Sequence, residues 1–310
     1  MDNTKTPNTT PINYNQHSLK KCYFPVYTLP SENPIVVAEQ LPAQVFDPPF
    51  FNDAVPMFRA QKSISKRFDF NSILSLTNEV SLPLKGFIFH TSHCGSTLLA
   101  NMLGASQKTR IISETEAING LLLSAIFYEM DRILLAQHLN AIITAYLQPL
   151  GEAEQVLFKL SSWNIFFIDL YQEAFPNVPW IFIDRNTEEV VQSLIKTGGG
   201  FAAWYYHPTT LLRDYFLGGN IKEDSIEKYL SAMVEAHKKY AENAHFGQKI
   251  VATYPSFLDN VENRILPHFN LKYSKTELAA MEEIKKYNAK SYTKVLFVPM
   301  QPKIPECSRP

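Results

Sequence analysis

The sequence predicts an α/β fold built around a parallel, doubly wound sheet. Two observations support this prediction: short apolar runs typical of buried strands, and longer segments between them in which apolar residues recur at helical spacing. Strands that alternate with helices in this order form parallel sheets covered by helices. The expected strands cover residues 86–90, 110–113, 156–160, 179–183 and 249–253. The expected helices cover residues 98–103, 117–147, 164–174, 187–196 and 225–244.

The chain divides into three segments by composition. Residues 1–18 are polar and rich in Asn and Thr, and we expect them to be disordered. Residues 19–81 combine frequent proline with Phe, Val and Tyr. Proline at this density prevents long helices while the apolar content favours burial, so an extended N-terminal arm packed on the main domain is predicted. The main domain covers residues 82–310, with no linker that would divide it.

Composition and charge argue against several classes of function. The 310 residues include 29 basic and 30 acidic side chains, so the net charge is -1. Without a global positive field, neither nucleic acid nor an anionic membrane is expected as a partner. The three cysteines are too few and too scattered for a disulfide framework or a zinc site. No apolar segment is long enough to span a bilayer and residues 1–16 lack the pattern of a signal peptide, so a cytoplasmic protein is expected.

The most informative segment is HTSHCGSTLL, residues 90–99, which follows the first expected strand and opens a helix. Small residues here let backbone N–H groups converge on an anion, and Ser96 and Thr97 add hydroxyl donors. The spacing approaches the P-loop pattern G-x-x-x-x-G-K-[ST], with His90 in place of the first glycine and Ser96 in place of the lysine. The segment predicts a P-loop NTPase-like three-layer sandwich, in which the missing lysine disfavours ATP or GTP hydrolysis. The alternative is an ordinary strand-to-helix turn with a Ser or Thr cap.

Residues 92–99 resemble the 5′-phosphosulfate loop of sulfotransferases that use PAPS (3′-phosphoadenosine 5′-phosphosulfate), which reads P-[RK]-S-G-[ST]-T-x-L. The Gly-Ser-Thr core of that motif is kept, whereas Ser92 and His93 stand where the family has Pro and Arg or Lys. The resemblance implies a nucleotide-binding loop. Its cofactor-binding residues are expected to be His93, Cys94, Gly95, Ser96, Thr97 and Leu98.

A second segment, WIFIDRNTEEVVQS at residues 180–193, is similar to the 3′-phosphate segment of the same family, a strand that ends in R-[ND]-P-x-[DE]-V-x-x-S. Arg185 and Ser193 keep the family's spacing, and threonine replaces the proline. A guanidinium fork grips phosphate oxygens and a hydroxyl adds a donor, so the resemblance implies that both residues bind the 3′-phosphate. The alternative is that Arg185 only forms an ion pair with Glu188 or Glu189.

The resemblance covers residues 85–283, and its later part is diffuse. The C-terminal glycine-rich loop that contacts the 3′-phosphate in cytosolic family members has no counterpart in this sequence. Lys290 or Lys294 could replace it, although the more ordinary expectation is that both are solvated surface lysines.

The resemblance implies in-line transfer of the sulfuryl group of PAPS to a hydroxyl or amine of an acceptor, expected to be a small molecule, without a metal. Lys159 ends the third expected strand and is assigned to the sulfonate or the 5′-phosphate; a lysine that only snorkels from a strand end is the alternative. His93, as imidazolium, would supply the charge of the missing loop cation. Glu114, directly after the second strand, is the first candidate for general base, with a structural role as its alternative, and His207 is the second candidate.

Two other functions remain open at this point. One is a catalytically decayed sulfotransferase-like protein that still binds a nucleotide, with His93 as the mark of decay. The other is a P-loop nucleotide or small-molecule kinase, because Asp184 ends a strand that resembles a Walker B segment. The missing loop lysine and the pair of Arg185 and Ser193 argue against the kinase. The sequence does not identify the acceptor.

Overall fold

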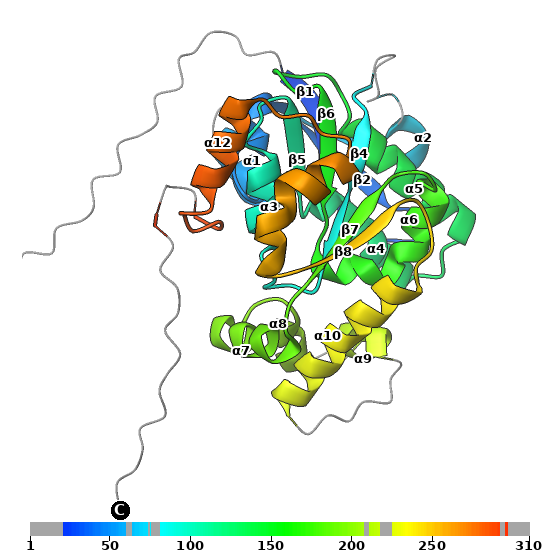
Figure 1. Cartoon of the computed structure of the whole chain (residues 1–310). Coiled ribbons are helices and arrows are strands. Elements are labelled where there is room, and N and C mark those ends of the chain that lie inside the picture. Colours follow the sequence, from blue (N-terminus) through cyan, green and yellow to red (C-terminus); the bar gives the residue numbers. More distant parts are fainter. Residues whose placement is uncertain are drawn as a thin grey trace, which may run out of the picture.

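The computed structural model describes residues 21–59, 64–73, 75, 81–207, 211–217, 225–291 and 295–296. Within them the chain is an α/β protein whose central sheet has five parallel strands in the order β5-β6-β4-β7-β8 (Figure 1). The strands are β4 (Leu84–His90), β5 (Thr109–Ser113), β6 (Gln155–Lys159), β7 (Trp180–Asp184) and β8 (Lys249–Thr253). All five predicted strands are present, with bounds within two residues of those expected. The predictions for residues 1–18 and for Lys294 lie outside the described residues.

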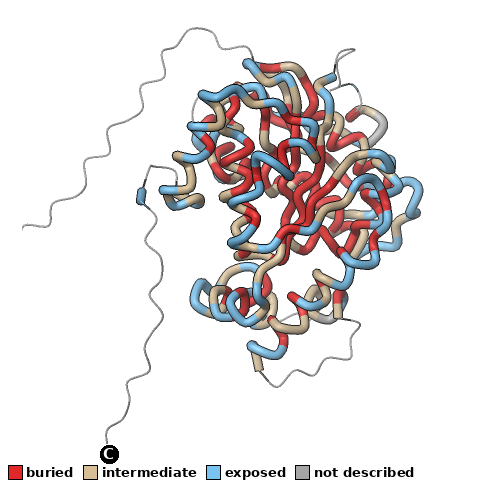
Figure 2. Tube along the Cα trace, viewed as in Figure 1, coloured by how far each residue is buried: buried red, intermediate tan, exposed pale blue. Residues whose placement is uncertain are grey.

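Side chains along the central strands alternate between two separate cores. In β4, Phe87 and Phe89 belong to one core and Ile88 to the other, as the two-residue period of a strand requires. In β7, Trp180 and Phe182 repeat the pattern in the first core. These strands form the buried centre of the molecule (Figure 2). Because both faces of the sheet are buried, the strands appear in the sequence as continuous apolar runs.

Helices cover both faces of the sheet (Figure 1). The first core includes residues of α4 (Glu116–Phe127), α5 (Arg132–Ala145), η3 (Ser162–Phe167), α6 (Ile168–Ala174), α7 (Thr187–Thr197), α8 (Phe201–Tyr206), α9 (Leu211–Leu217) and α10 (Ile226–Asn243). The second core includes residues of α3 (Ser96–Leu103), η4 (Ser256–Asn260), η5 (Val261–Ile265), α11 (Leu266–His268) and α12 (Lys275–Ile284). None of the described helices combines the length and apolar character needed to span a membrane.

The single long helix predicted over residues 117–147 is wrong, because the structure has two helices there, α4 and α5. Tyr128 has an extended backbone and ends α4. The side chain of Asp131 accepts a hydrogen bond from the backbone N–H of Leu134 at 2.9 Å and so caps the start of α5. The apolar residues on either side of this break keep a helical spacing, which concealed it.

The N-terminal region differs from the extended arm that was predicted. Its described residues form an antiparallel sheet with the order β1-β2-β3 and three short helical segments. These elements are β1 (Lys21–Leu29), β2 (Ile35–Pro42), η1 (Ala43–Phe46), α1 (Phe51–Arg59), β3 (Ser65–Phe68) and α2 (Phe70–Ile73). Proline is tolerated because β1 is an edge strand and its register shifts between Pro25 and Tyr27. The sheet shares the first core with the main domain, and Thr28 donates a hydrogen bond from its hydroxyl to the carbonyl of Ala117 in α4 at 2.6 Å.

Replacement of Gly120 by alanine tests the packing of α4 on β1. A Cβ at Gly120 would lie 2.1 Å from the carbonyl oxygen of Thr28, so the backbone of one element would have to move. Such overpacking costs about 1–3 kcal/mol, and we expect the free energy of unfolding, measured in urea, to fall by that amount. Gly199→Ala is the control, because a Cβ there meets nothing within 4 Å. An unfolding free energy for Gly120→Ala equal to that of the wild type would contradict this packing.

Candidate functional site

The loop between β4 and α3, called the phosphate loop after the ligand that its sequence predicts, lies at the point where the order of the strands reverses. The chain leaves β4, the central strand, between β6 on one side and β7 on the other. Ligands of open α/β sheets bind at this place, outside the carboxyl ends of the strands. The loop, residues 91–95, connects β4 to α3 there, so the segment singled out in the sequence occupies the expected ligand site of the fold.

The loop backbone takes up left-handed conformations at three of its residues. Ser92 has a φ of 73°, His93 of 47° and Gly95 of 80°. Each such conformation costs a non-glycine residue of order 1–3 kcal/mol, and turns of this kind create concave sites for anions. Glycine is required at position 95 for a second reason, because a Cβ there would lie 2.5 Å from the ring of Tyr254.

The first turn of α3 is left without a side-chain cap. Its N-cap residue is Gly95, which has no side chain to bond the first N–H groups of the helix. Ser96 and Thr97, the first two helical residues, are both buried. The Ser or Thr cap of the alternative interpretation is therefore absent, and binding of an anion by this turn stays a prediction. An uncapped helix N-terminus has backbone N–H groups available to an anion.

His90, which replaces the first glycine of the P-loop pattern, holds the loop through hydrogen bonds of its ring. Its buried ring accepts a hydrogen bond at Nδ1 from the N–H of Ser92 at 3.0 Å. Nε2 must then carry the proton, which it donates to the carbonyl of Leu160 at 2.9 Å. Burial first and the charge of Lys159 second hold the pKa of His90 well below its ordinary value. This ring is thus a neutral brace between the loop and the end of β6.

The two sequence motifs meet at His93. Arg185 donates a hydrogen bond from Nη1 to the carbonyl of His93 at 3.1 Å, and the ring Nδ1 of His93 bonds Oγ of Ser193 at 2.6 Å. The guanidinium of Arg185 also lies over the ring of Tyr254, 5.0 Å from its centroid. The ion pair proposed as the alternative role of Arg185 is present as well, with Glu189 at 2.7 Å. The arginine therefore joins α7, the phosphate loop and the segment after β8.

The environment of His93 argues against a positively charged ring. Burial, the charge of Lys290 and the charge of Arg185, in that order, lower the pKa of His93 to about 4. The ligand-free protein consequently holds a neutral imidazole at pH 7, which is hydrogen-bonded to Ser193. The expectation that His93 replaces the family's loop cation as imidazolium is not supported by this arrangement.

Glu114 and Lys159 form a partly buried ion pair through Oε1 of the glutamate and Nζ of the lysine. The side chain of Lys159 is fully buried and lies under the ring of Phe50 at 5.1 Å, whereas that of Glu114 is 30% exposed. The backbone N–H of Glu114, which has a φ of 51°, donates to the carbonyl of Lys159 at 2.8 Å. Lys159 does lie at the carboxyl edge beside the phosphate loop, as predicted, but its charge is already balanced. The structural role that was the alternative for Glu114 is present.

His207 lies at the C-terminal end of α8 and is exposed. The aromatic residues before it divide between core and surface. Trp204 packs against Trp163 and Phe216, with ring centroids 6.1 Å and 5.8 Å away, whereas Tyr206 is exposed. Of the two candidate bases, Glu114 contacts another predicted site residue, Lys159.

Sequence reasoning missed three residues that shape the site. His90 was noted only as a departure from the glycine of the P-loop pattern. Tyr254 follows β8 and reaches both Gly95 and Arg185, and its position gave no signal because β8 is distant in sequence. Lys290 was considered as a replacement for the missing 3′-phosphate loop, with a solvated surface lysine as the more ordinary expectation, and the effect of its charge on His93 was not predicted.

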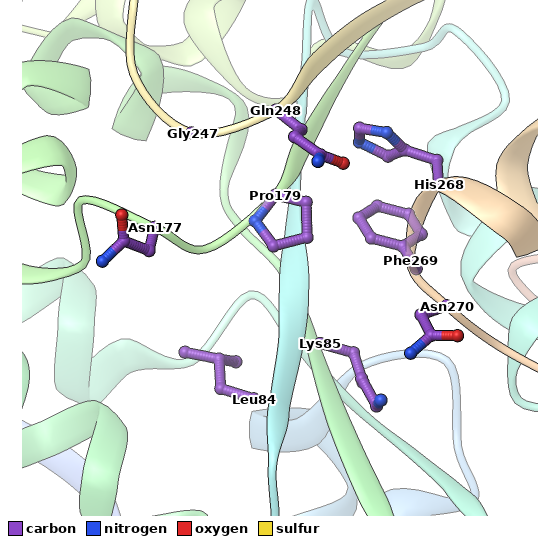
Figure 3. Close-up of a pocket in the computed structure, with 9 residues that line it drawn as sticks. All are labelled: Leu84, Lys85, Asn177, Pro179, Gly247, Gln248, His268, Phe269 and Asn270. Carbon is purple, nitrogen blue, oxygen red and sulfur yellow. The ribbon is translucent and has the colours of Figure 1, made fainter.

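A hollow of about 450 Å³ lies at the opposite edge of the sheet, where the strands begin (Figure 3). It is lined by Leu84, Lys85, Asn177, Pro179, Gly247, Gln248, His268, Phe269 and Asn270. Its ring nitrogen donor, Nε2 of His268, is hydrogen-bonded to the carbonyl of Trp180 at 3.0 Å. The hollow contains no residue of either motif, and open α/β sheets bind ligands at the other edge. We therefore assign no function to it.

The ion pair of Glu114 and Lys159 makes an asymmetric prediction for stability. Glu114→Gln leaves a fully buried ammonium without its counter-charge, and we expect it to lower the free energy of unfolding by about 3–5 kcal/mol. Lys159→Met leaves only the partly exposed carboxylate and should cost less. The double variant should recover most of the stability lost in Glu114→Gln. Urea denaturation of the four proteins measures this cycle, and equal midpoints for all of them would mean that the pair contributes nothing to folding.

Comparison with known proteins adds no assignment to this site. No protein-family model matches the chain, and no curated protein matches it significantly. The function has to be inferred from the residues themselves: an uncapped helix behind a left-handed loop, an arginine and a serine bonded to that loop, and a partly buried ion pair at the adjacent strand ends.

Proposed function

We propose that this protein is a PAPS-dependent sulfotransferase that transfers the sulfuryl group to a hydroxyl or amine of a small acceptor. The observation that carries the proposal is the contact of Arg185 and Ser193 with His93. Two segments about ninety residues apart in the sequence, each resembling one phosphate-binding motif of the same family, form one site. A chance resemblance of either segment alone would not require them to meet.

The chemical character of the site suits a nucleotide with two separate anionic groups. The loop and the start of α3 offer backbone N–H groups for the 5′-phosphosulfate. Arg185, on the β7 side of the loop, offers a guanidinium for the 3′-phosphate. Its side chain is 27% exposed, so a ligand can reach it. The loop lacks the P-loop lysine that a β,γ-phosphate pair needs.

In the reaction a bond forms between the acceptor's oxygen or nitrogen and sulfur, while the bond from sulfur to the 5′-phosphate oxygen breaks and its electron pair leaves with the 3′,5′-bisphosphate. The protein's part is to orient the two partners and to neutralise the oxygens that gain charge. Glu114 is our candidate to accept the acceptor's proton. Its contacts with Lys159 and His90 both use Oε1, which leaves Oε2 for the acceptor.

One observation favours a second candidate, a P-loop kinase. Asp184 ends β7 beside the loop, and its Oδ1 is buried without a hydrogen-bond partner among the described residues. An aspartate at this place holds a magnesium ion in P-loop enzymes that use ATP. Nucleotide preference and its dependence on magnesium separate the two candidates.

Arg185→Ala tests whether the arginine that contacts His93 binds the 3′-phosphate. We expect it to weaken binding of adenosine 3′,5′-bisphosphate about 10- to 150-fold, because a hydrogen bond to a charged group contributes roughly 1.5–3 kcal/mol. Binding of adenosine 5′-monophosphate, which lacks the 3′-phosphate, should change little. Both are measured by titration calorimetry without magnesium. Arg264→Ala is the matched control, because Arg264 is exposed and its charge acts on His268 at the opposite edge of the sheet.

Two results would count against the proposal. Equal weakening of both nucleotides in Arg185→Ala would mean that the arginine only supports the loop. Tighter binding of ATP with magnesium than of the bisphosphate by the wild type would favour the kinase.

A further inference from the structure

The proposed phosphosulfate site lacks an available permanent cation on its own loop. His93, at the position where the family has Arg or Lys, has its pKa lowered to about 4 by burial and by two neighbouring cations. Lys159 is fully buried and paired with Glu114. Arg185 is bonded to the His93 carbonyl and to Glu189. With His93 neutral, Lys159 paired and Arg185 assigned to the 3′-phosphate, a phosphosulfate brought to this loop would gain from a further positive charge.

The segment after α12 brings another cation to the same place. The side-chain amide of Asn101, on α3, donates a hydrogen bond to the carbonyl of Ala289 at 2.8 Å. The phosphate loop precedes this helix directly, so the bond ties residues 288–290 to the element that presents the loop. Lys285 adds a second tether, from Nζ to the carbonyl of Leu258 at 3.0 Å. Lys290 is therefore held beside α3 although the chain has already completed its last described helix.

The groups whose pKa responds to the charge of Lys290 indicate which part of the sheet its ammonium lies near. It is the second cause, after burial, of the low pKa of His93, and it adds a smaller contribution, after burial, Lys159 and His237, to the low pKa of His90. Burial also lowers the pKa of Lys290 itself, with attraction by Glu114 opposing this and repulsion by Lys159 adding to it. These neighbours belong to the loop and to the ends of β4, β5 and β6. The ammonium thus acts on the carboxyl edge of the sheet, on the β6 side of the loop.

No hydrogen bond or ion pair holds the Lys290 ammonium among the described residues, whereas Lys285 and Lys286 in the same segment pair with Glu282 and Glu283. Lys290 as a residue is exposed, so a ligand can reach it, although its ammonium is surrounded closely enough for partial burial to lower its pKa. The charges of Lys290 and Lys159 repel one another, and both interact with a single carboxylate, that of Glu114. These three side chains together leave one net positive charge at the loop. An anion bound there would remove that repulsion.

We propose that Lys290 supplies the permanent positive charge of the phosphate loop and bonds a non-bridging oxygen of the phosphosulfate. This inference rests on the proposed function and deepens it. It assigns to the C-terminal segment the task that the family gives to the loop Arg or Lys, and it differs from a contact with the 3′-phosphate, which belongs to Arg185. The bound nucleotide would then be held from two sides, by Arg185 at one end and by Lys290 at the other.

The test compares Lys290→Met, Lys290→Arg and the control Lys286→Met with the wild type. The ligands are PAPS and adenosine 5′-phosphosulfate, which lacks the 3′-phosphate, in titration calorimetry. Lys290→Met should weaken both ligands to the same extent, about 10- to 100-fold, and Lys290→Arg should retain most of the affinity. Arg185→Ala, in contrast, should weaken only PAPS. Lys286→Met should bind both ligands as the wild type does, because its ammonium pairs with Glu283.

A ligand-free measurement separates this inference from the proposed function. Removal of the Lys290 charge should raise the pKa of His93, followed by NMR titration of the ring, whereas Lys286→Met should leave it unchanged. An unchanged His93 pKa in Lys290→Met, or weakening of PAPS alone, would overturn the assignment of Lys290. Failure of the wild type to bind either ligand, with the His93 shift present, would instead refute the proposed function.

Discussion

The backbone of the phosphate loop takes up left-handed conformations at Ser92, His93 and Gly95, and much of the surrounding site supports that arrangement. Such conformations persist only where neighbouring structure enforces them. The ring of His90 accepts a hydrogen bond from the backbone N–H of Ser92, and Arg185 donates one to the carbonyl of His93. Tyr254 packs directly on the third, where only glycine fits. His90 at the end of β4 and two segments distant in the sequence, after β7 and after β8, thus converge on five residues, a degree of support that an ordinary connecting turn does not need.

Charge at the site is arranged around one buried lysine. Lys159 is fully buried and needs Glu114 as its partner, so its ammonium is committed before any ligand arrives. Nearby cations and burial keep His90 and His93 neutral, which turns both histidines into hydrogen-bonding groups. In the proposed function, the positive charges offered to the nucleotide come from outside the loop: Arg185 from the end of β7 and Lys290 from the segment after α12. We propose that this division lets the loop bind an anion although it lacks both the P-loop lysine and the Arg or Lys of the family it resembles.

The strands and the turn between β4 and α3 could be predicted because their signals are local. Each strand of the central sheet contains a short apolar run, and the Gly-Ser-Thr segment follows the first of these strands after a short loop. The N-terminal sheet could not be predicted in the same way, since its stability depends on packing against α4 and its prolines suggested an extended chain. The break at Asp131 was hidden by apolar residues that keep a helical spacing across it.

Within the site, the residues that come together were easier to predict than their protonation and ion pairing. Arg185, Ser193 and the loop come together as the two motifs suggested. The protonation of His93 depends on burial and on Lys290, which lies almost two hundred residues away, and no pattern in the sequence reports such a contact. The ion pair of Glu114 and Lys159 likewise depends on the pairing of β5 with β6.

Sulfuryl transfer itself is the central claim, and mass spectrometry tests it most directly. The purified protein is incubated with PAPS and a mixture of small alcohols, phenols, amines and sugars, without added metal. The account predicts that PAPS is converted to adenosine 3′,5′-bisphosphate as one acceptor gains the mass of a sulfonate group, and that Arg185→Ala slows both changes together. Binding of PAPS without any sulfonated product across a broad set of acceptors would contradict the claim and leave a nucleotide-binding protein without transferase activity.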